Sequence, residues 1–523
     1  MRKRNRRTPE SGVALLVVLL ALLIVSAIGM GMIYTSNTET SINANYRDTQ
    51  LAYYAMQAGL EEVRDRMRAN APSAITLPTA MPSSGSAGSI VYVTNPTGSE
   101  SISPTTSTNN PYFDDEFCHE SFTTLTGLTV PANAATPCGS GGAVPSSAVT
   151  TVASIAPFTG TSSALSYKWV RITLKQNGTF PNALVAPVDV THPLSGQVCW
   201  DSANAREIVA DSLGYSSCAL AQNAGYTVAP VYILTSLAST AQGSRRLGQT
   251  EVTAVDIMPP PAALAMAGPG ASFPTAPNSN NLTINGNNTG APAYTGPGAC
   301  STTIPSQVAA VSTGNMSGQT TVAGNIPPVR DGNYTGTAPT APTGTPATPS
   351  VVDEGTDAGG SAQLGGMWSS PQQLNNLVTT IAGMADQTVV CGIGTPCTGT
   401  YGTDAHPQVT YVDGDLNLTG GAGLLVVTGT LTANGHPSFD GLILVIGQGI
   451  MAFSGGGNGQ INGSIFIANT NSRTSPYAQL STLGSPQMSW SGGGTNAIQY
   501  NSCWANWKNN LHYMAVSSRE LMF

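Results

Sequence analysis

Residues 12–33 read GVALLVVLLALLIVSAIGMGMI and contain no charged side chain. The apolar run from Val13 to Ile33 is interrupted only by Ser26, Gly29 and Gly31. As a helix it would be roughly 31 Å long at about 1.5 Å per residue, which matches the roughly 30 Å hydrocarbon core of a bilayer. The sequence therefore predicts a membrane-spanning α-helix over this run.

The charges that flank this segment set its expected orientation. Five basic residues precede it: Arg2, Lys3, Arg4, Arg6 and Arg7. A basic cluster keeps its side of a membrane helix in the cytoplasm, so we expect the chain after Ile33 to be exported. A cleaved secretory signal is the alternative, but its apolar core is about 7 to 15 residues long and ends at a small-residue cleavage site. The longer run favours a retained single-pass anchor.

The helical pattern continues beyond the apolar run, because no proline occurs between Pro9 and Pro72. Four apolar residues of this stretch recur at helical spacing: Met56, Leu60, Val63 and Met67. They share one face of an amphipathic helix, which predicts that this face packs against protein. We expect one helix from Val13 to about Ala69, about 85 Å long.

The leader resembles that of a known family. A short basic stretch that ends in Gly12, followed by VALLVVLL and a long helix, resembles the class III leader of type IV pilins and type II secretion pseudopilins. The resemblance implies that a prepilin peptidase of the inner membrane cuts between Gly12 and Val13. Residues 47–62, RDTQLAYYAMQAGLEE, resemble the Q-L-A-x-x-A-x-x-A-G-L-E signature of the PilX N-terminal family of minor pilins. Other pilins are then the implied partners of this helix.

The sequence departs from the common pilin pattern at two positions. Most pilins have a glutamate five residues into the mature chain, where this sequence has Val17, and many relatives have a glutamate where it has Gln57. The family's first glutamate is thought to neutralise the N-terminal amine of a neighbouring subunit, and a buried carboxylate is costly without such a partner. A subunit that lacks this glutamate resembles PilX-type proteins and the K-type pseudopilin, which are linked to the filament tip or to initiation of the filament.

The composition excludes one large class of partners. Only 9% of the 523 residues are charged, against roughly 25% in an average soluble domain. The chain has 19 Lys and Arg against 27 Asp and Glu, a formal net charge of −8. Binding to nucleic acid needs a basic stripe that neutralises phosphates, so we expect no nucleic-acid partner.

All eight cysteines follow the apolar run: Cys118, Cys138, Cys199, Cys218, Cys300, Cys391, Cys397 and Cys503. An even number on the exported side is typical of disulfides in an oxidising compartment. The neighbour pairs Cys118–Cys138, Cys199–Cys218 and Cys391–Cys397 are preferred, although eight cysteines allow 105 pairings. No C-x-x-C or Cys/His zinc spacing is present, so we expect no metal.

The exported chain divides by composition into three parts. Residues 71–258 contain four strand candidates, at 89–94, 170–174, 231–234 and 251–257, and predict a β-rich pilin-like domain. Residues 259–370 are rich in Pro, Gly and Thr, which predicts a linker region. Residues 371–523 predict a further β-rich domain, which begins with a short helix over Leu374–Met384 whose apolar residues form core.

Glycines precede three short apolar runs in this last part, at Gly423, Gly441 and Gly463. Recurring strand–turn–strand units at 18 and 22 residues favour a parallel β-solenoid, in which each coil stacks on the next and glycines form the corners. An antiparallel meander is the alternative. The expected fold class is α+β and mainly β: a leader (1–12), a pilin-type helix (13–70), a pilin-like β-sheet domain and a β-solenoid-like domain.

The search for catalytic chemistry finds no enzyme motif. The five histidines, His119, His192, His406, His436 and His512, form no H-E-x-x-H or i, i+4 pair, and G-x-S-x-G and P-loop patterns are absent. The sequence Asp413-Gly414-Asp415 predicts a turn rather than a calcium loop. The acidic group at 114–120 predicts a solvated loop. We expect neither an enzyme nor a cofactor.

Together these features predict a non-enzymatic minor pilin of the PilX type, which enters or primes a type IV pilus, with the tip as a reasonable place. Such a protein waits in the inner membrane with a cytoplasmic N-terminus and is extracellular once assembled. The alternatives are a tip adhesin whose C-terminal β domain contacts a surface ligand of unknown chemistry, a K-like pseudopilin of a type II secretion system, and, least favoured, a membrane-tethered hydrolase.

Overall fold

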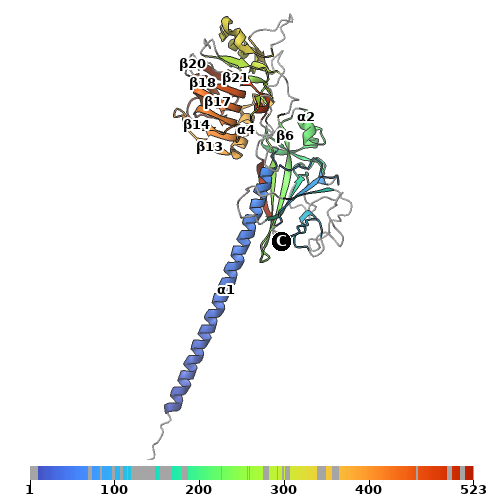
Figure 1. The fold of residues 1–523 in the computed structure, drawn as a ribbon, viewed down its shortest axis with the longest axis vertical. Helices are drawn as coiled ribbons and strands as arrows, with labels where there is room; N and C mark the ends of the chain where they lie inside the picture. The colour runs from blue at the N-terminus through green and yellow to red at the C-terminus, as the bar shows by residue number, and fades with distance from the viewer. Residues whose placement is uncertain are drawn as a thin grey trace, which may run out of the picture.

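The structure, a computed structural model, describes residues 10–68, 74–82, 85–96, 100–106, 110–114, 116–118, 148–153, 167–178, 187–224, 226–255, 257, 259–274, 282–290, 293–296, 300, 307–337, 349–355, 364, 366–454, 458–491, 497–506 and 513–521. A long helix extends away from two β-rich parts (Figure 1). We name these the first β body, strands β1–β7 and β22, and the second β body, strands β8–β21.

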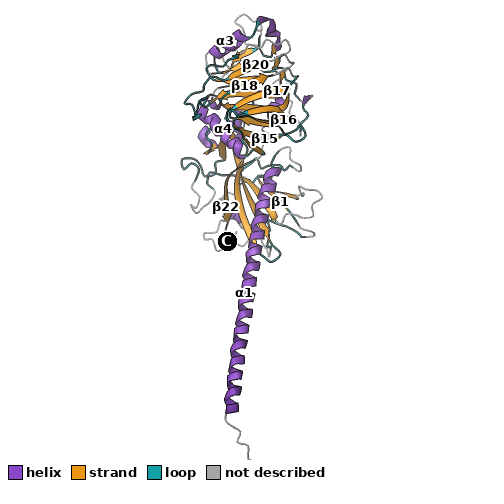
Figure 2. Ribbon diagram, turned by 90° about the vertical axis from the view of Figure 1, so that its left-hand side faces the viewer, coloured by secondary structure: helices purple, strands orange, loops and turns teal. Residues whose placement is uncertain are grey.

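Helix α1 (Glu10–Arg66) is a single helix of 57 residues, close to the expected range and about 85 Å long. Its first half projects away from both β bodies (Figure 2). Its second half lies on the first β body, where the predicted apolar face is confirmed. Met56, Leu60, Val63 and Met67 are each at most 3% exposed and share a core cluster with the sheet.

A glycine allows α1 to approach this sheet closely. A Cβ added at Gly59 would lie 2.7 Å from Cγ of Tyr167 and 2.8 Å from Oγ of Ser236. Distances below about 3 Å are not tolerated between real Cβ atoms and their neighbours. The small residue at this position therefore sets the distance between helix and sheet.

The first β body is an eight-stranded sheet with the order β2-β1-β3-β6, and β6 also pairs with β4 and β7. Its strands are β1 (Ile90–Thr94), β2 (Val149–Ala153), β3 (Tyr167–Leu174), β4 (Val198–Asp201), β5 (Arg206–Val209), β6 (Val228–Ser239), β7 (Arg245–Thr253) and β22 (Met514–Leu521). Strands β3, β6 and β7 are antiparallel neighbours, whereas β1 and β2 are parallel. The expected strand at 251–257 ends earlier, at Thr253.

Both faces of this sheet are covered. The eight residues of β3 are all buried, so the alternation around Arg171 does not produce a solvated face. A second cluster, which contains Tyr92, Phe117 and Trp169, packs on the face opposite α1. It includes the short helix η2 (Glu116–Cys118). The prediction of a solvated acidic loop is wrong for Asp114 and Glu116, which are buried.

The second β body is a 14-stranded sheet. Its strands are β8 (Ala262–Ala267), β9 (Thr283–Asn285), β10 (Ala309–Thr313), β11 (Tyr334–Thr335), β12 (Val351–Asp353), β13 (Gln387–Val390), β14 (Cys397–Tyr401), β15 (Gln408–Asp413), β16 (Leu416–Val427), β17 (Thr430–Gly447), β18 (Ile450–Ser454), β19 (Gln460–Asn469), β20 (Gln487–Ser491) and β21 (Ala497–Tyr500). All pairings between these named strands are parallel. The antiparallel meander is therefore wrong for this part.

Three glycines stack in this sheet, one per layer. Gly423 pairs with Gly441, and Gly441 pairs with Gly463. Their φ angles are +128°, +158° and +143°, in a region that favours glycine. A Cβ at Gly441 or Gly463 would overlap the carbonyl oxygen of the glycine in the layer before it. The sequence spacing of these glycines is thus the spacing of successive layers.

The linker expected at 259–370 is wrong for a large share of its described residues. Strand β8 lies inside the second sheet, between β10 and β19, and its six residues are at most 1% exposed. Strands β9, β11 and β12 extend the same stack, and α3 (Met316–Asn325) and η7 (Pro328–Asn333) lie among them. The small apolar side chains of β8, AALAMA, fit a strand that is covered on both faces. The Pro-, Gly- and Thr-rich composition of the surrounding sequence does not indicate this strand.

The chain end corrects another expected boundary. Strand β22 pairs antiparallel with β7, from Met514 opposite Thr253 to Leu521 opposite Leu247. The segment 371–523 is therefore not one domain, because its last strand belongs to the first β body. The second β body lies between β7 and β22 in the sequence.

The short helix predicted before the repeats is confirmed as α4 (Pro371–Gly383), which follows η8 (Gly366–Ser369). Leu374, Leu377 and Ile381 are fully buried and belong to a cluster on the outer side of the second sheet. Ala203, in the turn between β4 and β5 of the first β body, joins the same cluster, as do Val255 and Ile257 between β7 and β8. The two β bodies thus share apolar core.

Three disulfides lie in the described residues. Cys199–Cys218 joins β4 to α2 (Cys218–Asn223), with the Cα atoms 5.7 Å apart, and Cys391–Cys397 spans six residues between β13 and β14. Both are among the expected neighbour pairs. Cys300 pairs with Cys503 of α5 (Ser502–Ala505), across 203 residues. The expected Cys118–Cys138 pair lies outside the residues whose side chains are described.

Candidate functional site: the N-terminal helix and two cavities

The apolar half of α1 is exposed from Val13 to Ile33, apart from the half-exposed Gly29. Val13 is 66% exposed and Ile33 64%. The helix is long and apolar enough to cross a membrane, by length and composition, which is compatible with a single-pass anchor or a signal sequence. Ser26 donates its hydroxyl to the carbonyl oxygen of Leu22 at 2.8 Å. Its polar group is therefore satisfied within the helix, as an apolar environment requires.

The buried stripe of α1 continues beyond the first β body as an exposed one. Ile42, Tyr46 and Tyr53 follow the same helical repeat as Met56, and Ile42 and Tyr46 are 60% and 64% exposed. On the same half, Gln50 donates a hydrogen bond to the hydroxyl of Tyr46 at 2.7 Å. The distal half of the helix therefore has an apolar surface that extends past the sheet it packs on.

The expected cleavage site lies at the start of this helix. The bond between Gly12 and Val13 falls in the first turn of α1, which begins at Glu10. Residues 1–9 of the leader lie outside the described residues. Cleavage by a peptidase therefore stays a prediction.

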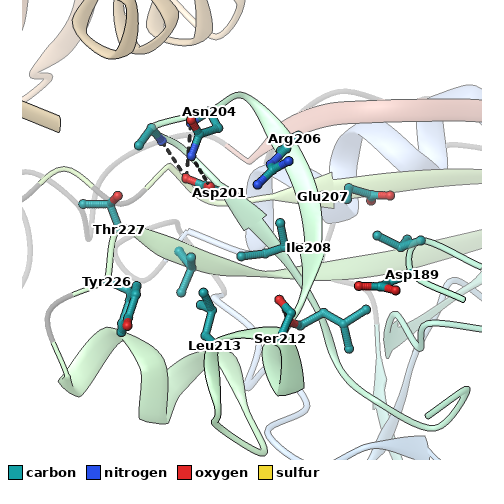
Figure 3. A pocket seen from close by; sticks show the side chains of 14 residues that line it. Asp189, Asp201, Asn204, Arg206, Glu207, Ile208, Ser212, Leu213, Tyr226 and Thr227 are labelled. Atoms are coloured by element: carbon teal, nitrogen blue, oxygen red, sulfur yellow. Dashed lines mark hydrogen bonds between the residues drawn. The ribbon is translucent and has the colours of Figure 1, made fainter. Parts of the chain in front are cut away.

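A cavity of about 570 Å³ opens beside β4 and β5 (Figure 3). Its apolar lining is Val188, Ala203, Ile208, Val209, Leu213 and Val228, and its polar lining is Asp189, Asp201, Asn204, Arg206, Glu207, Ser212, Tyr226 and Thr227. The 3-10 helix η5 (Ala210–Leu213) forms part of its wall. A cavity lined by both apolar and polar side chains can hold a small molecule.

The polar groups of this cavity are largely engaged in local structure. Asp201 accepts backbone N–H bonds from Ala203 at 3.0 Å and Asn204 at 3.2 Å, together with the Asn204 amide (Figure 3). Ser212 donates its hydroxyl to the carbonyl of Val209 at 2.7 Å. These bonds stabilise turns. Among its lining residues the cavity has no histidine or cysteine that could form a nucleophile and base pair.

Two carboxyl groups of the cavity have shifted pKa values. Hydrogen bonds from the hydroxyl and backbone N–H of Thr191 lower the pKa of Asp189. Burial raises the pKa of Glu207, against the opposing effect of Lys175, whose Nζ lies 2.8 Å from its carboxylate. Both shifts follow from local contacts and burial.

A second cavity, of about 790 Å³, lies where α1 meets the turn between β6 and β7. It is lined by Leu51, Ala52, Ala55, Glu100, Tyr112, Lys168, Ser239, Thr240, Ala241 and Gln242. Lys168 pairs with Glu100 at 2.7 Å and lies over the Tyr112 ring. This cavity borders the part of α1 that leaves the sheet.

The structure also places the residues considered for metal binding. Asp413 ends β15 and Asp415 precedes β16, so this sequence forms the predicted turn between two strands. Asp415 accepts backbone N–H bonds from Thr430 and Gly394 at 2.7 and 2.6 Å. Of the described residues, no three His, Cys, Asp or Glu side chains form a group that could hold a metal ion.

Comparison with known proteins gives no relative: no protein-family model matches the chain, and neither a curated protein nor a solved structure matches it.

Proposed function

We propose that this protein is a non-enzymatic minor pilin of the PilX type, which enters or primes a type IV pilus at its tip. The observation that carries the proposal is the division of α1 into two halves. The first half is apolar and exposed, and the second packs its Met56–Met67 face onto an antiparallel sheet. A subunit that moves from a membrane into a filament core needs an apolar helix that its own body leaves uncovered.

The leader supports the same proposal. The Gly12–Val13 bond stands at the junction between basic and apolar sequence, where a prepilin peptidase would cut. Val17 replaces the usual glutamate, so this subunit offers no carboxylate to the N-terminal amine of a neighbour. A subunit without that contact is better suited to the first position of a filament than to a repeated position in the shaft.

The β bodies add a second line of support. In this proposal the first β body is a pilin-like domain, and the second, with its parallel layers and glycine column, is a β-solenoid-like extension. A body of this size is difficult to repeat along a shaft. The protein then waits in the inner membrane with its N-terminus in the cytoplasm, and its partners are prepilin peptidase and other pilins.

Processing of the leader tests the proposal. In cells with prepilin peptidase, the wild-type protein should be shortened and begin at Val13, as measured by intact mass and N-terminal sequencing. Gly12→Val should block the shortening and remove the protein from sheared filaments. Gly29→Val is the matched control, because a Cβ at Gly29 meets no atom within 4 Å. A mature wild-type protein that retains residues 1–12 would overturn the proposal.

A K-like pseudopilin and a tip adhesin are separated by a second measurement. Loss of the protein should reduce the number of surface pili if it primes pilus assembly. Loss of type II secretion with normal piliation would favour the pseudopilin. Loss of attachment with normal piliation would favour the adhesin, for which the second β body supplies a suitable surface.

A further inference from the structure

One side of the second β body is a polar sheet face without charge. It is formed by β14, the first halves of β16 and β17, β18 and β20, which stack one above another (Figure 1). We call it the open face. Its outward residues are Thr398, Thr400, Asn417, Thr419, Thr430, Thr432, Asn434, Ile450, Ala452, Ser454, Gln487, Ser489 and Ser491. None of them is buried, and none is charged.

The outward residues form rows that run across the strands. The central row pairs Thr398 with Asn417, then Thr432, Ala452 and Ser489, in register. Strands in a sheet lie about 4.8 Å apart, and outward residues of one strand about 6.6 Å apart. The open face is therefore a regular array made mainly of hydroxyl and amide groups, with Ile450 and Ala452 among them.

The polar groups of the central row are free to bind a ligand. The side chains of Thr398, Asn417, Thr432 and Ser489 form no hydrogen bond to another described residue. Other polar groups of the face are engaged: Thr400 bonds to Thr419, Thr430 donates to Gln448, Ser454 donates to Asn434, and Ser491 donates to the carbonyl oxygen of Phe453. Hydroxyl and amide groups both donate and accept hydrogen bonds. The central row can therefore bind a partner whose groups both donate and accept hydrogen bonds.

A second side of this β body is covered by the protein itself, whereas the third side is partly exposed, at Ser438 and Gln460, and carries the charged side chain of Asp440. Leu424, Leu442 and Leu444 point outward from β16 and β17 on the second side and are buried under α4. The segment that carries Thr295 lies near Asp440. Thr295 donates a hydrogen bond to Asp404, and the charge of Asp404 raises the pKa of Asp440. The open face has no such cover among the described residues.

We propose that the open face binds a neutral polysaccharide. We choose a neutral polymer because of charge complementarity. A face without charged side chains forms no ion pair with an anionic or cationic polymer, and the protein's net charge of −8 repels an acidic polymer. Sugar hydroxyls donate and accept as the central row does. Ile450 and Ala452, which are half-buried on the same face, provide apolar contact for the C–H groups of sugar rings. The inference goes beyond filament assembly and rests on it only for export of the β bodies.

Purified full-length protein in detergent tests the inference without any filament. Its retention is measured on insoluble cellulose, mannan and β-1,3-glucan, with alginate as the acidic polymer. We expect retention on at least one neutral polymer, and at least a tenfold loss for Thr432→Lys/Ser489→Lys, which places two charges in the central row. Thr320→Lys/Thr321→Lys on α3 is the matched control, because both residues are exposed and neither belongs to the open face. Ala452→Lys replaces the double variant if that variant fails to fold.

Each outcome decides the inference. Selective loss in the open-face variant, with an unchanged melting curve, supports it. No retention on any neutral polymer, equal retention of both variants, or preference for alginate overturns it. Inhibition of ice growth without polysaccharide binding would also overturn it, since a regular threonine array fits an ice surface. Failure here leaves the processing of Gly12–Val13 untouched, so the two proposals fail separately.

Discussion

Arg171 and Asp114 form an ion pair inside the first β body, with Nη1 2.5 Å from Oδ2 and both side chains fully buried. The pair is surrounded by further partners. Tyr92 donates its hydroxyl to Asp114 at 2.9 Å, Arg171 donates to Thr235 at 3.2 Å, and the guanidinium lies over the Phe117 ring. Burial, followed by the nearby Asp114 charge, raises the pKa of Tyr92. Asp114 and Phe117 are thereby fixed to β3.

Removal of one partner should destabilise the first β body strongly. Asp114→Asn or Arg171→Met leaves a buried charge without its counter-charge, which costs about 3–5 kcal/mol. The double variant Asp114→Asn/Arg171→Met should recover part of this loss, because neither charge then remains. Urea unfolding followed by tryptophan fluorescence measures the free energy of unfolding, and Trp169 of the same cluster contributes to that signal.

The surface pair Arg246–Glu520 is the control for this experiment. Both side chains are 29% exposed, so Glu520→Gln should cost less than about 1 kcal/mol. If Asp114→Asn costs no more than Glu520→Gln, the pair at Arg171 is not buried as described.

This pair shows a limit of prediction from sequence. Asp114 lies in an acidic group, Asp114, Asp115 and Glu116, that has the composition of a solvated loop. Arg171 lies in a strand where apolar and polar residues alternate, and this alternation does not indicate whether its side chain is buried. Their burial depends on a contact between segments 57 residues apart, and local pattern carries no information on it. The Met56–Met67 face could be predicted, because helix periodicity acts within a few turns.

Among Gly29, Gly31 and Gly59 of α1, replacement of Gly59 should destabilise the fold most. Gly59→Ala places a Cβ against Tyr167 and Ser236 and should cost about 1–3 kcal/mol through overpacking. Gly31→Ala is the matched control, since a Cβ at Gly31 meets nothing within 4 Å, and alanine is the better helix former. Thermal unfolding in detergent compares the two. A lower melting temperature for Gly31→Ala than for Gly59→Ala would contradict the packing.

The two β bodies differ in how far their sequences predict them. In the second, glycine at Gly423, Gly441 and Gly463 marks successive layers, because backbone atoms of adjacent layers leave no room for a Cβ. Strand β8 carries no comparable signal. Its alanines follow three prolines and precede glycine-rich sequence, and only the stack that it enters decides its structure. The return of β22 to β7 is likewise a long-range event.

Deletion of residues 514–523 should expose one edge of β7. Strand β22 covers that edge with an antiparallel ladder, and Ser517 donates a hydrogen bond to Glu251 at 2.7 Å. The lost ladder should raise hydrogen exchange at β7 while the second β body remains protected. Glu520→Gln, which keeps the ladder, should leave the exchange at β7 unchanged. Equal protection in the deletion variant would refute the pairing.

Asp440 should make stability depend on pH. Its carboxyl is half-buried, and burial raises its pKa to about 6, with Asp404 adding to the shift and the Asn462 amide, 2.6 Å away, opposing it. The unfolded value is about 3.9, so between about pH 4 and pH 6 the folded protein binds more protons than the unfolded chain. Stability should therefore fall as pH rises through this window.

The variants Asp440→Asn and Asp404→Asn identify the source of this dependence. A shift of about 2 units corresponds to roughly 3 kcal/mol, which solvent screening at a half-exposed group reduces to about 1 kcal/mol. Asp440→Asn should flatten that part of the pH profile of the melting temperature. Asp404→Asn removes the neighbouring negative charge, so it should lower the pKa of Asp440 and move the window to lower pH. Wild-type stability that rises from pH 4 to pH 6 to the same extent as in Asp440→Asn would exclude Asp440 as the group responsible.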